Sequence, residues 1–92
     1  MEKKNTSITS GSEITLKIRD FIVKNFLIEF KDEINNETDL FEIGIIDSFG
    51  FIELITYIEK TFRVEFEPDE LLTDHLSNVN SMVALIRKKL NG

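Results

Sequence analysis

The stretch "SFGFIELITYIEKTF", residues 48–62, decides the fold, because its apolar residues repeat with the period of an α-helix. Successive residues of a helix are turned by about 100° around its axis. On this wheel Glu53, Thr56 and Lys60 share one side. The opposite, apolar arc consists of Phe51, Leu54, Ile55, Ile58 and Phe62, with Ile52 at its edge. The stretch therefore predicts an amphipathic helix that packs one face against a core.

The start of this helix carries two residues that suit an N-cap, Asp47 and Ser48. The acid also complements the helix dipole. Ser48 has a second interpretation, because a helix N-terminus favours an attached phosphate. Phe49 lies on the polar side of the wheel, where a large aromatic side chain suits contact with another protein. From the residues alone, Ser48 is either a cap or a site that another enzyme modifies.

Helical patterns also occupy both ends of the chain. Ser10 and Glu13 have the spacing of a capping box, and they predict a helix from about Gly11 or Glu13 to about Phe26 or Leu27. Its apolar positions are Ile14, Ile18, Phe21, Ile22 and Phe26. Near the C-terminus, Ser77 or Asn78 caps a last helix. The apolar positions of that helix are Val79, Met82, Val83, Ile86 and Leu90.

Two connections join these helices. The first, roughly residues 28–47, has its expected bend at Asn35–Asn36. Five apolar residues of this connection are expected to pin it to the core: Leu40, Phe41, Ile43, Ile45 and Ile46. In the second, Val64 and Phe66 alternate with charges, but without a second strand an extended loop is expected. Pro68 then opens a short helical turn to about Leu72, and another turn near residues 73–76 is a further option. The predicted fold is all-α, a small bundle of three main helices and one short helix.

Length and composition predict one small domain over residues 11–91, preceded by a disordered polar lead over residues 1–10. The absence of cysteine excludes disulfides and thiolate metal sites. No stretch approaches the roughly 18 apolar residues of a membrane span, and the first residues lack the apolar core of a secretory signal. We therefore expect a cytoplasmic, monomeric protein without a membrane segment.

Charge is distributed unevenly along the chain. Residues 29–74 hold 14 acids and three bases, a net charge of −11. An acidic middle argues against binding to nucleic acid, whose phosphates it would repel. It suits a basic protein partner, although plain solubility is an equally open explanation.

Enzymatic sites fit the sequence poorly. The only histidine, His75, lies in a polar stretch and is expected at the surface, so Ser48 has no evident base for a nucleophilic mechanism. The acidic segments lack the alternating pattern of a calcium loop, and Gly44 and Gly50 are not followed by the Lys of a phosphate loop. We assign no catalytic residue and no metal ligand.

The segment "LFEIGIIDSFGFIELITYIEKTF", residues 40–62, resembles the phosphopantetheine-attachment region of acyl and peptidyl carrier proteins. That family has a Leu, then a Gly, two further residues, and Asp-Ser-Leu, with "EL" and "IE…F" on the same helix. The matching positions here are Leu40, Gly44, Asp47, Ser48, Phe49, Glu53, Leu54, Ile58, Glu59 and Phe62. "VEFEPDEL" and "SNVNSMVALI" are similar to the segments around the family's last two helices, so that the resemblance covers about residues 12–90.

The resemblance implies a carrier and not a catalyst. A phosphopantetheinyl transferase would attach 4′-phosphopantetheine from coenzyme A to Ser48, and the thiol of that arm would hold acyl or aminoacyl groups as thioesters. Loading and downstream biosynthetic enzymes would be further partners. Partner recognition would involve Asp47 and Phe49, with Ile52, Glu53 and Thr56 on or beside the same surface.

Two departures from the family pattern bear on the pathway. The usual Leu after the serine is Phe49, and the next position, often acidic in fatty-acid carriers, is Gly50, whose small size would leave the serine accessible. We therefore expect a free-standing carrier in polyketide, nonribosomal-peptide or related specialised biosynthesis. Alternatives are a carrier of fatty-acid synthesis, a D-alanyl carrier, a degenerate carrier without the arm, and an unmodified helical interaction module in which Ser48 is only a cap.

Overall fold

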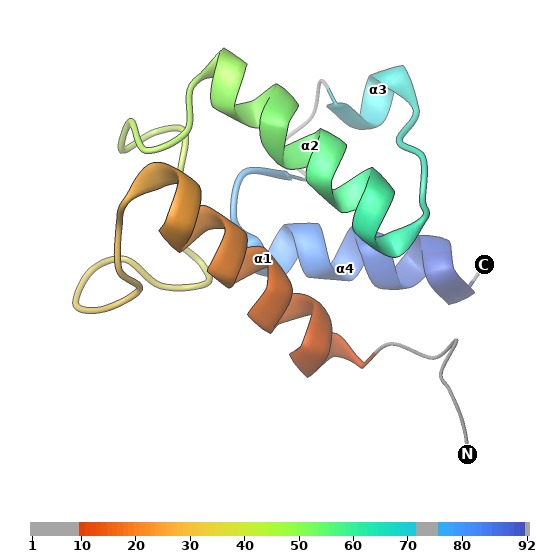
Figure 1. Ribbon diagram of the computed structural model, residues 1–92, viewed down its shortest axis with the longest axis horizontal. Coiled ribbons are helices and arrows are strands. Elements are labelled where there is room, and N and C mark those ends of the chain that lie inside the picture. Colours follow the sequence, from red (N-terminus) through yellow and green to blue (C-terminus); the bar gives the residue numbers. More distant parts are fainter. Residues whose placement is uncertain (1–9, 72–75, 92) are drawn as a thin grey trace.

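The computed structural model describes residues 10–71 and 76–91 (Figure 1). Over these residues the chain forms four helices and no strand, which confirms the predicted all-α bundle. The helices are α1 (Gly11–Phe26), α2 (Ser48–Phe62), α3 (Pro68–Leu71) and α4 (Val79–Asn91). The predicted surface position of His75, residues 73–75 of the second possible turn and, except for Ser10, the disordered lead lie outside the described residues.

Each of the three main helices begins at a side chain that accepts a backbone N–H. The Ser10 hydroxyl accepts from Glu13 N at 3.1 Å, and Asn78 Oδ1 accepts from Ser81 N at 2.7 Å. At the start of α2, Asp47 Oδ1 accepts from Gly50 N at 2.8 Å. The N-cap of α2 is therefore Asp47 and not Ser48, and Asn78 provides the side-chain cap of α4.

One core joins the helices. α1 packs against both α4 and α2, and Figure 1 shows α1 and α2 slanting alongside each other while α4 runs across the molecule. The helical core residues are Ile14, Ile18, Ile22, Leu54, Ile55, Ile58, Phe62, Val79, Met82, Val83 and Ile86. Val64 and Phe66 are buried in the extended connection after α2, as predicted for a loop. In the part of the chain that the structure describes, no helix is both long and apolar enough to span a bilayer.

The long connection between α1 and α2 is tied to the start of α4 by backbone hydrogen bonds. Leu40 N donates to Ser77 O at 2.9 Å, and Asn80 N donates to Asn36 O at 3.0 Å. The predicted bend is confirmed, since Asn35 Oδ1 accepts from Glu37 N at 2.8 Å. These bonds hold a segment without regular structure in one position against the bundle.

The predicted apolar anchors of this connection are only partly correct. Leu40 and Ile46 are buried, and Phe41 and Ile45 pack half-buried against the core. Ile43 is 48% exposed, so the prediction that it pins the loop is wrong. The carbonyl of Leu40 accepts from both Ile45 N and Ile46 N at 3.0 Å, which closes residues 40–46 into a tight turn. Both ends of this turn reach the core, and its middle is left outside.

The last turn of α4 extends past the core. Leu90 continues the apolar period of the sequence but is 37% exposed, because it borders an open surface hollow with Arg63 and Leu85. One turn earlier, Ile86 is fully buried. Periodicity therefore predicts the face of α4 correctly but not the point where the core ends.

α3 is held to α4 through one carboxylate. Glu70 Oε1 accepts from Glu67 N, in front of α3, and from Lys89 Nζ of α4, both at 2.7 Å. The Lys89 ammonium also lies 5.4 Å from the centroid of the Phe66 ring. The hydrogen bond from Lys89 lowers the pKa of Glu70 below its ordinary value of 4.5, with a smaller contribution from Glu67 N. The short helix is thus anchored by an ionic contact in addition to apolar packing.

Candidate functional site at the start of α2

The capping of α2 leaves Ser48 as its first helical residue. Asp47 has an extended backbone (φ −102°, ψ −175°), and its carboxylate takes the N–H of Gly50. Ser48 is exposed, and its hydroxyl has no hydrogen-bond partner among the described residues. Of the two roles that the sequence left open for Ser48, the capping role thus belongs to its neighbour.

The surroundings of the Ser48 hydroxyl suit a covalently attached phosphate. The hydroxyl stands at the positive end of a helix of 15 residues, whose first turn holds no acidic side chain of its own. Gly50 N is engaged by Asp47, and the preceding N–H groups of the first turn have no partner within the helix. An anion on Ser48 would therefore meet free N–H groups and a favourable dipole.

Gly50 lies on the inner side of this turn, against α1. It is buried, and a Cβ added there would come within 2.5 Å of Phe26 Cε1 and 3.3 Å of Asp47 Oδ1. The sequence interpretation, that a small residue keeps the serine accessible, misses this contact. The structure shows that the absence of a side chain at Gly50 lets the ring of Phe26 lie directly on the first turn of α2.

Three aromatic contacts pack around α2 and the end of α1. The Phe26 ring meets Phe21 edge-on with centroids 6.5 Å apart, and Phe21 stacks on Tyr57 of α2 at 4.3 Å. From the loop side, Phe41 meets Phe51 edge-on at 5.2 Å. Ser48 is therefore an exposed residue on a turn whose inner face is closely packed.

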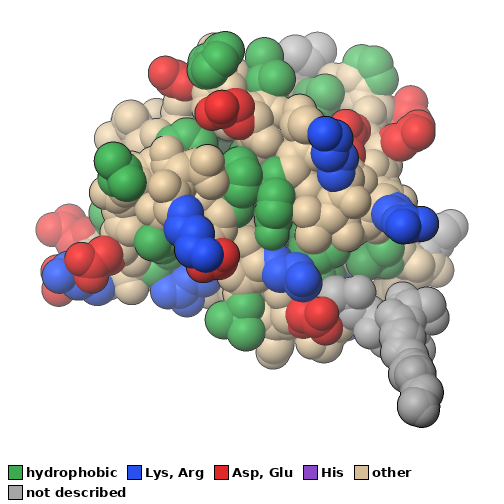
Figure 2. All heavy atoms as spheres, viewed as in Figure 1, with side chains coloured by type: hydrophobic (Ala, Val, Ile, Leu, Met, Phe, Trp, Pro, Cys, Tyr) green, Lys and Arg blue, Asp and Glu red, His purple; other side chains and the backbone are tan. Residues whose placement is uncertain are grey.

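The residues predicted for partner recognition lie together on the outer side of α2. Phe49, Ile52, Glu53 and Thr56 have helical spacing and are all exposed, and we call them the α2 face. Phe49 is 73% exposed and Ile52 63%. Asp47 is exposed just before them. Figure 2 shows apolar and acidic side chains next to one another at the upper edge of the molecule, where α2 begins.

Sequence reasoning assigned no role to Leu27, which is the most exposed large apolar side chain of the described residues, at 88%. The sequence gives little indication of this exposure, because a leucine at the end of an apolar helical pattern is normally assigned to the helix and its buried face. Within the same described ranges, no three His, Cys, Asp or Glu side chains are grouped to hold a metal ion.

Comparison with known proteins agrees with this geometry. Residues 27–86 match a family model described as "Phosphopantetheine attachment site". The chain is 31% identical over 72 residues to a probable acyl carrier protein, PigG, of Serratia sp.. This match covers 78% of this chain and 83% of PigG. It is 29% identical over 70 residues to a D-alanyl carrier protein of Streptococcus pyogenes, covering 74% and 89% of the two chains.

A third relative is a much longer protein. The chain is 34% identical over 85 residues to the non-reducing polyketide synthase pkdA of Emericella nidulans. The match covers 92% of this chain but only 3% of the synthase. Similar domains therefore occur both in small proteins and within a large synthase.

Proposed function

Because this chain belongs to the phosphopantetheine-attachment family, whose domains carry covalently bound 4′-phosphopantetheine, we propose that Ser48 is the residue that bears this group. The observation that carries the proposal is the division of roles at the start of α2. Asp47 caps the helix, so the exposed Ser48 hydroxyl is left available to an incoming enzyme. The domain that carries the arm extends over residues 11–91.

Attachment is a phosphoryl transfer from coenzyme A. The Ser48 oxygen forms a bond to the phosphorus next to the pantetheine unit, and the bond from that phosphorus to the nucleotide breaks. The serine proton leaves to a base of the transferase, and the nucleoside bisphosphate departs. The product is a phosphodiester, whose negative charge is stabilised by the N-terminus of α2. The arm supplies a thiol that this cysteine-free chain lacks.

The chain then acts as a carrier for reactions that other enzymes catalyse. Acyl or aminoacyl groups are held as thioesters on the arm, and tethering raises their concentration at each partner enzyme. The transferase and the loading enzymes recognise Asp47 and the α2 face, where exposed apolar side chains stand beside the acid Glu53. The carrier works in the cytoplasm as a monomer, without binding nucleic acid.

For the pathway, we favour polyketide, nonribosomal-peptide or related specialised biosynthesis. Relatives named as an acyl carrier protein and as a polyketide synthase support this choice. The relative named as a D-alanyl carrier protein supports the second candidate, a D-alanyl carrier, since the match covers 89% of that protein.

Intact-mass measurement tests the attachment site. The purified chain is incubated with coenzyme A, Mg²⁺ and a broad-specificity phosphopantetheinyl transferase, and it should gain the mass of one phosphopantetheine. Ser48→Ala should gain none. Ser12→Ala is the matched control, because Ser12 is also an exposed serine in the first turn of a helix. An adduct on Ser48→Ala, or no adduct on the unchanged chain with several transferases, would contradict the proposal.

A further inference from the structure

Leu27 adopts a conformation that does not suit a leucine. It ends α1 in the left-handed region (φ 55°, ψ 47°), where a Cβ crowds the following carbonyl oxygen. Glycine is favoured there because it lacks a Cβ, and asparagine because its short polar side chain can hydrogen-bond the local backbone. Its side chain is 88% exposed and therefore gains almost no burial in return. Neither local conformation nor the core accounts for an apolar residue at this position.

Leu27 lies at the same end of the molecule as Ser48. The residue before it, Phe26, is the one whose ring lies on Gly50, and the residue before Gly50 is Phe49. Leu27 and Phe49, at 88% and 73%, are the two most exposed large apolar side chains of the described residues. They flank the contact between the end of α1 and the start of α2, next to the proposed attachment site.

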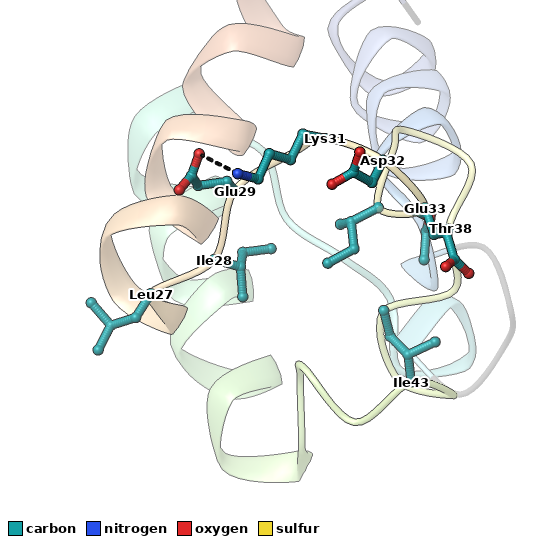
Figure 3. A pocket seen from close by; sticks show the side chains of 9 residues that line it. Leu27, Ile28, Glu29, Lys31, Asp32, Glu33, Thr38 and Ile43 are labelled. Atoms are coloured by element: carbon teal, nitrogen blue, oxygen red, sulfur yellow. Dashed lines mark hydrogen bonds and ion pairs between the residues drawn. The ribbon is translucent and has the colours of Figure 1, made fainter.

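A groove of about 630 Å³ opens beside Leu27, between the end of α1 and the loop that follows it. We call it the α1-end groove. Its apolar lining includes Ile28, Ile34 and the exposed Ile43. Figure 3 shows Ile28 pointing inward on the α1 side and Ile43 across from it, while Leu27 projects outward from the edge. The middle of the 40–46 turn, which the core leaves outside, thus forms one wall.

The rim of the groove is acidic. Glu29, Asp32 and Glu33 border it and are exposed. The lining holds one base, Lys31, whose Nζ lies 3.7 Å from Glu29 Oε1. The four charged residues sum to −2, so the groove favours a partner that carries positive charge around its apolar group. A second copy of this chain, with its own net charge of −6, is disfavoured.

We propose that the α1-end groove, with Leu27 at its edge, is a second docking site for the transferase that modifies Ser48. It receives an apolar side chain of that enzyme flanked by lysine or arginine. Ile43 precedes Ser48 by five residues, so their Cα atoms are at most about 18 Å apart, within the reach of one enzyme surface. This inference rests on the proposed carrier function and adds a site outside the α2 face.

Leu27→Asn tests the inference directly. Asparagine suits the left-handed conformation, and replacing Leu27 removes almost no buried surface, so the melting temperature should stay the same or rise. The kcat/KM for phosphopantetheine addition by the broad-specificity transferase should fall at least about fivefold. Leu16→Gln is the matched control, because Leu16 is also an exposed leucine of α1, 69% exposed, but lies outside the groove. Its kcat/KM should remain within about twofold of the unchanged chain.

Binding without chemistry provides a second readout. On titration with the transferase in the absence of coenzyme A, the methyl NMR signals of Leu27 and Ile43 should shift and that of Leu16 should not. Glu33→Gln should weaken this binding at low salt, whereas the control Glu65→Gln, another exposed acid outside the groove, should not.

The outcomes separate the two proposals. If the unchanged chain is modified and Leu27→Asn is modified equally fast, the docking site is refuted and the carrier function stands. Equal losses of kcat/KM in Leu27→Asn and Leu16→Gln also refute the docking site. So do shifts of the Leu27 methyl signals that depend on the concentration of this chain in the absence of transferase. If the unchanged chain gains no adduct, the proposed function fails and this inference fails with it.

Discussion

Gly50→Ala offers the sharpest test of how the start of α2 is built. In an ordinary helix this change stabilises by up to about 1 kcal/mol, because alanine is the better helix former. Here the new Cβ would lie 2.5 Å from Phe26 Cε1, closer than Cβ atoms in proteins approach other atoms, and 3.0 Å from Cζ, a tight contact. The Phe26 ring must therefore move, and we expect a net loss of stability.

The size of the loss follows from the contacts of that ring. If Phe26 swings away, it leaves its edge-on contact with Phe21, which is stacked on Tyr57. Overpacking of this kind costs about 1–3 kcal/mol, against a propensity gain of about 1 kcal/mol at most. The expected net effect is about 1 kcal/mol of destabilisation, or about 4–8 °C in melting temperature for a domain of this size.

A double-mutant cycle isolates the contact. Leucine at position 26 lacks the ring atoms that the Cβ would meet, so Gly50→Ala should be neutral or stabilising in a Phe26→Leu background. The four variants are compared by thermal and urea unfolding. A Gly50→Ala that raises the melting temperature of the otherwise unchanged chain would refute the argument, and so would an equal shift in both backgrounds. If Gly50 served only to expose Ser48, the variant would lose modification rate without losing stability.

Three further predictions concern the same end of the molecule and the anchor of α3. Asp47→Ala removes the cap of α2 and should lower stability by about 1 kcal/mol in urea unfolding, and no change would mean that another group caps the helix. Phe49→Ala should slow modification by the transferase with little change in melting temperature, since the side chain is 73% exposed; a large loss of stability would place Phe49 in the core instead. Because the pKa of Glu70 is lowered in the folded chain, its contribution to stability is present above pH 4.5 and is lost as the pH falls below that value. Lys89→Met should therefore lose less stability on acidification than the unchanged chain, as measured by melting temperatures between about pH 3 and 6. An equal loss of melting temperature in both chains would contradict this prediction.

The helices follow from local physics, and for this reason they were predictable. The pairing of Ser10 with Glu13 starts α1 where the capping pattern places it. The 3.6-residue period places Leu54 and Ile58 in the core and Phe49 at the surface, as the structure confirms. The family pattern around Ser48 is also local, because Gly44, Asp47 and Ser48 belong to one short segment, and it indicated the cofactor before any geometry was known.

The tertiary structure decided what lies between elements. The side chains of Asp47 and Ser48 are both suitable for capping α2. The backbone conformation decides between them, because Asp47 is extended and Ser48 is the first helical residue. The role of Gly50 depends on Phe26, 24 residues earlier, and no periodicity reports a contact between two helices. The exposure of Ile43 depends on how the carbonyl of Leu40 closes a turn. Sequence alone determined the helices and the attachment motif, because hydrogen bonds and period act within a few residues. The surface around Ser48 could be known only from the tertiary structure, because it forms where the end of α1, the loop and the start of α2 meet.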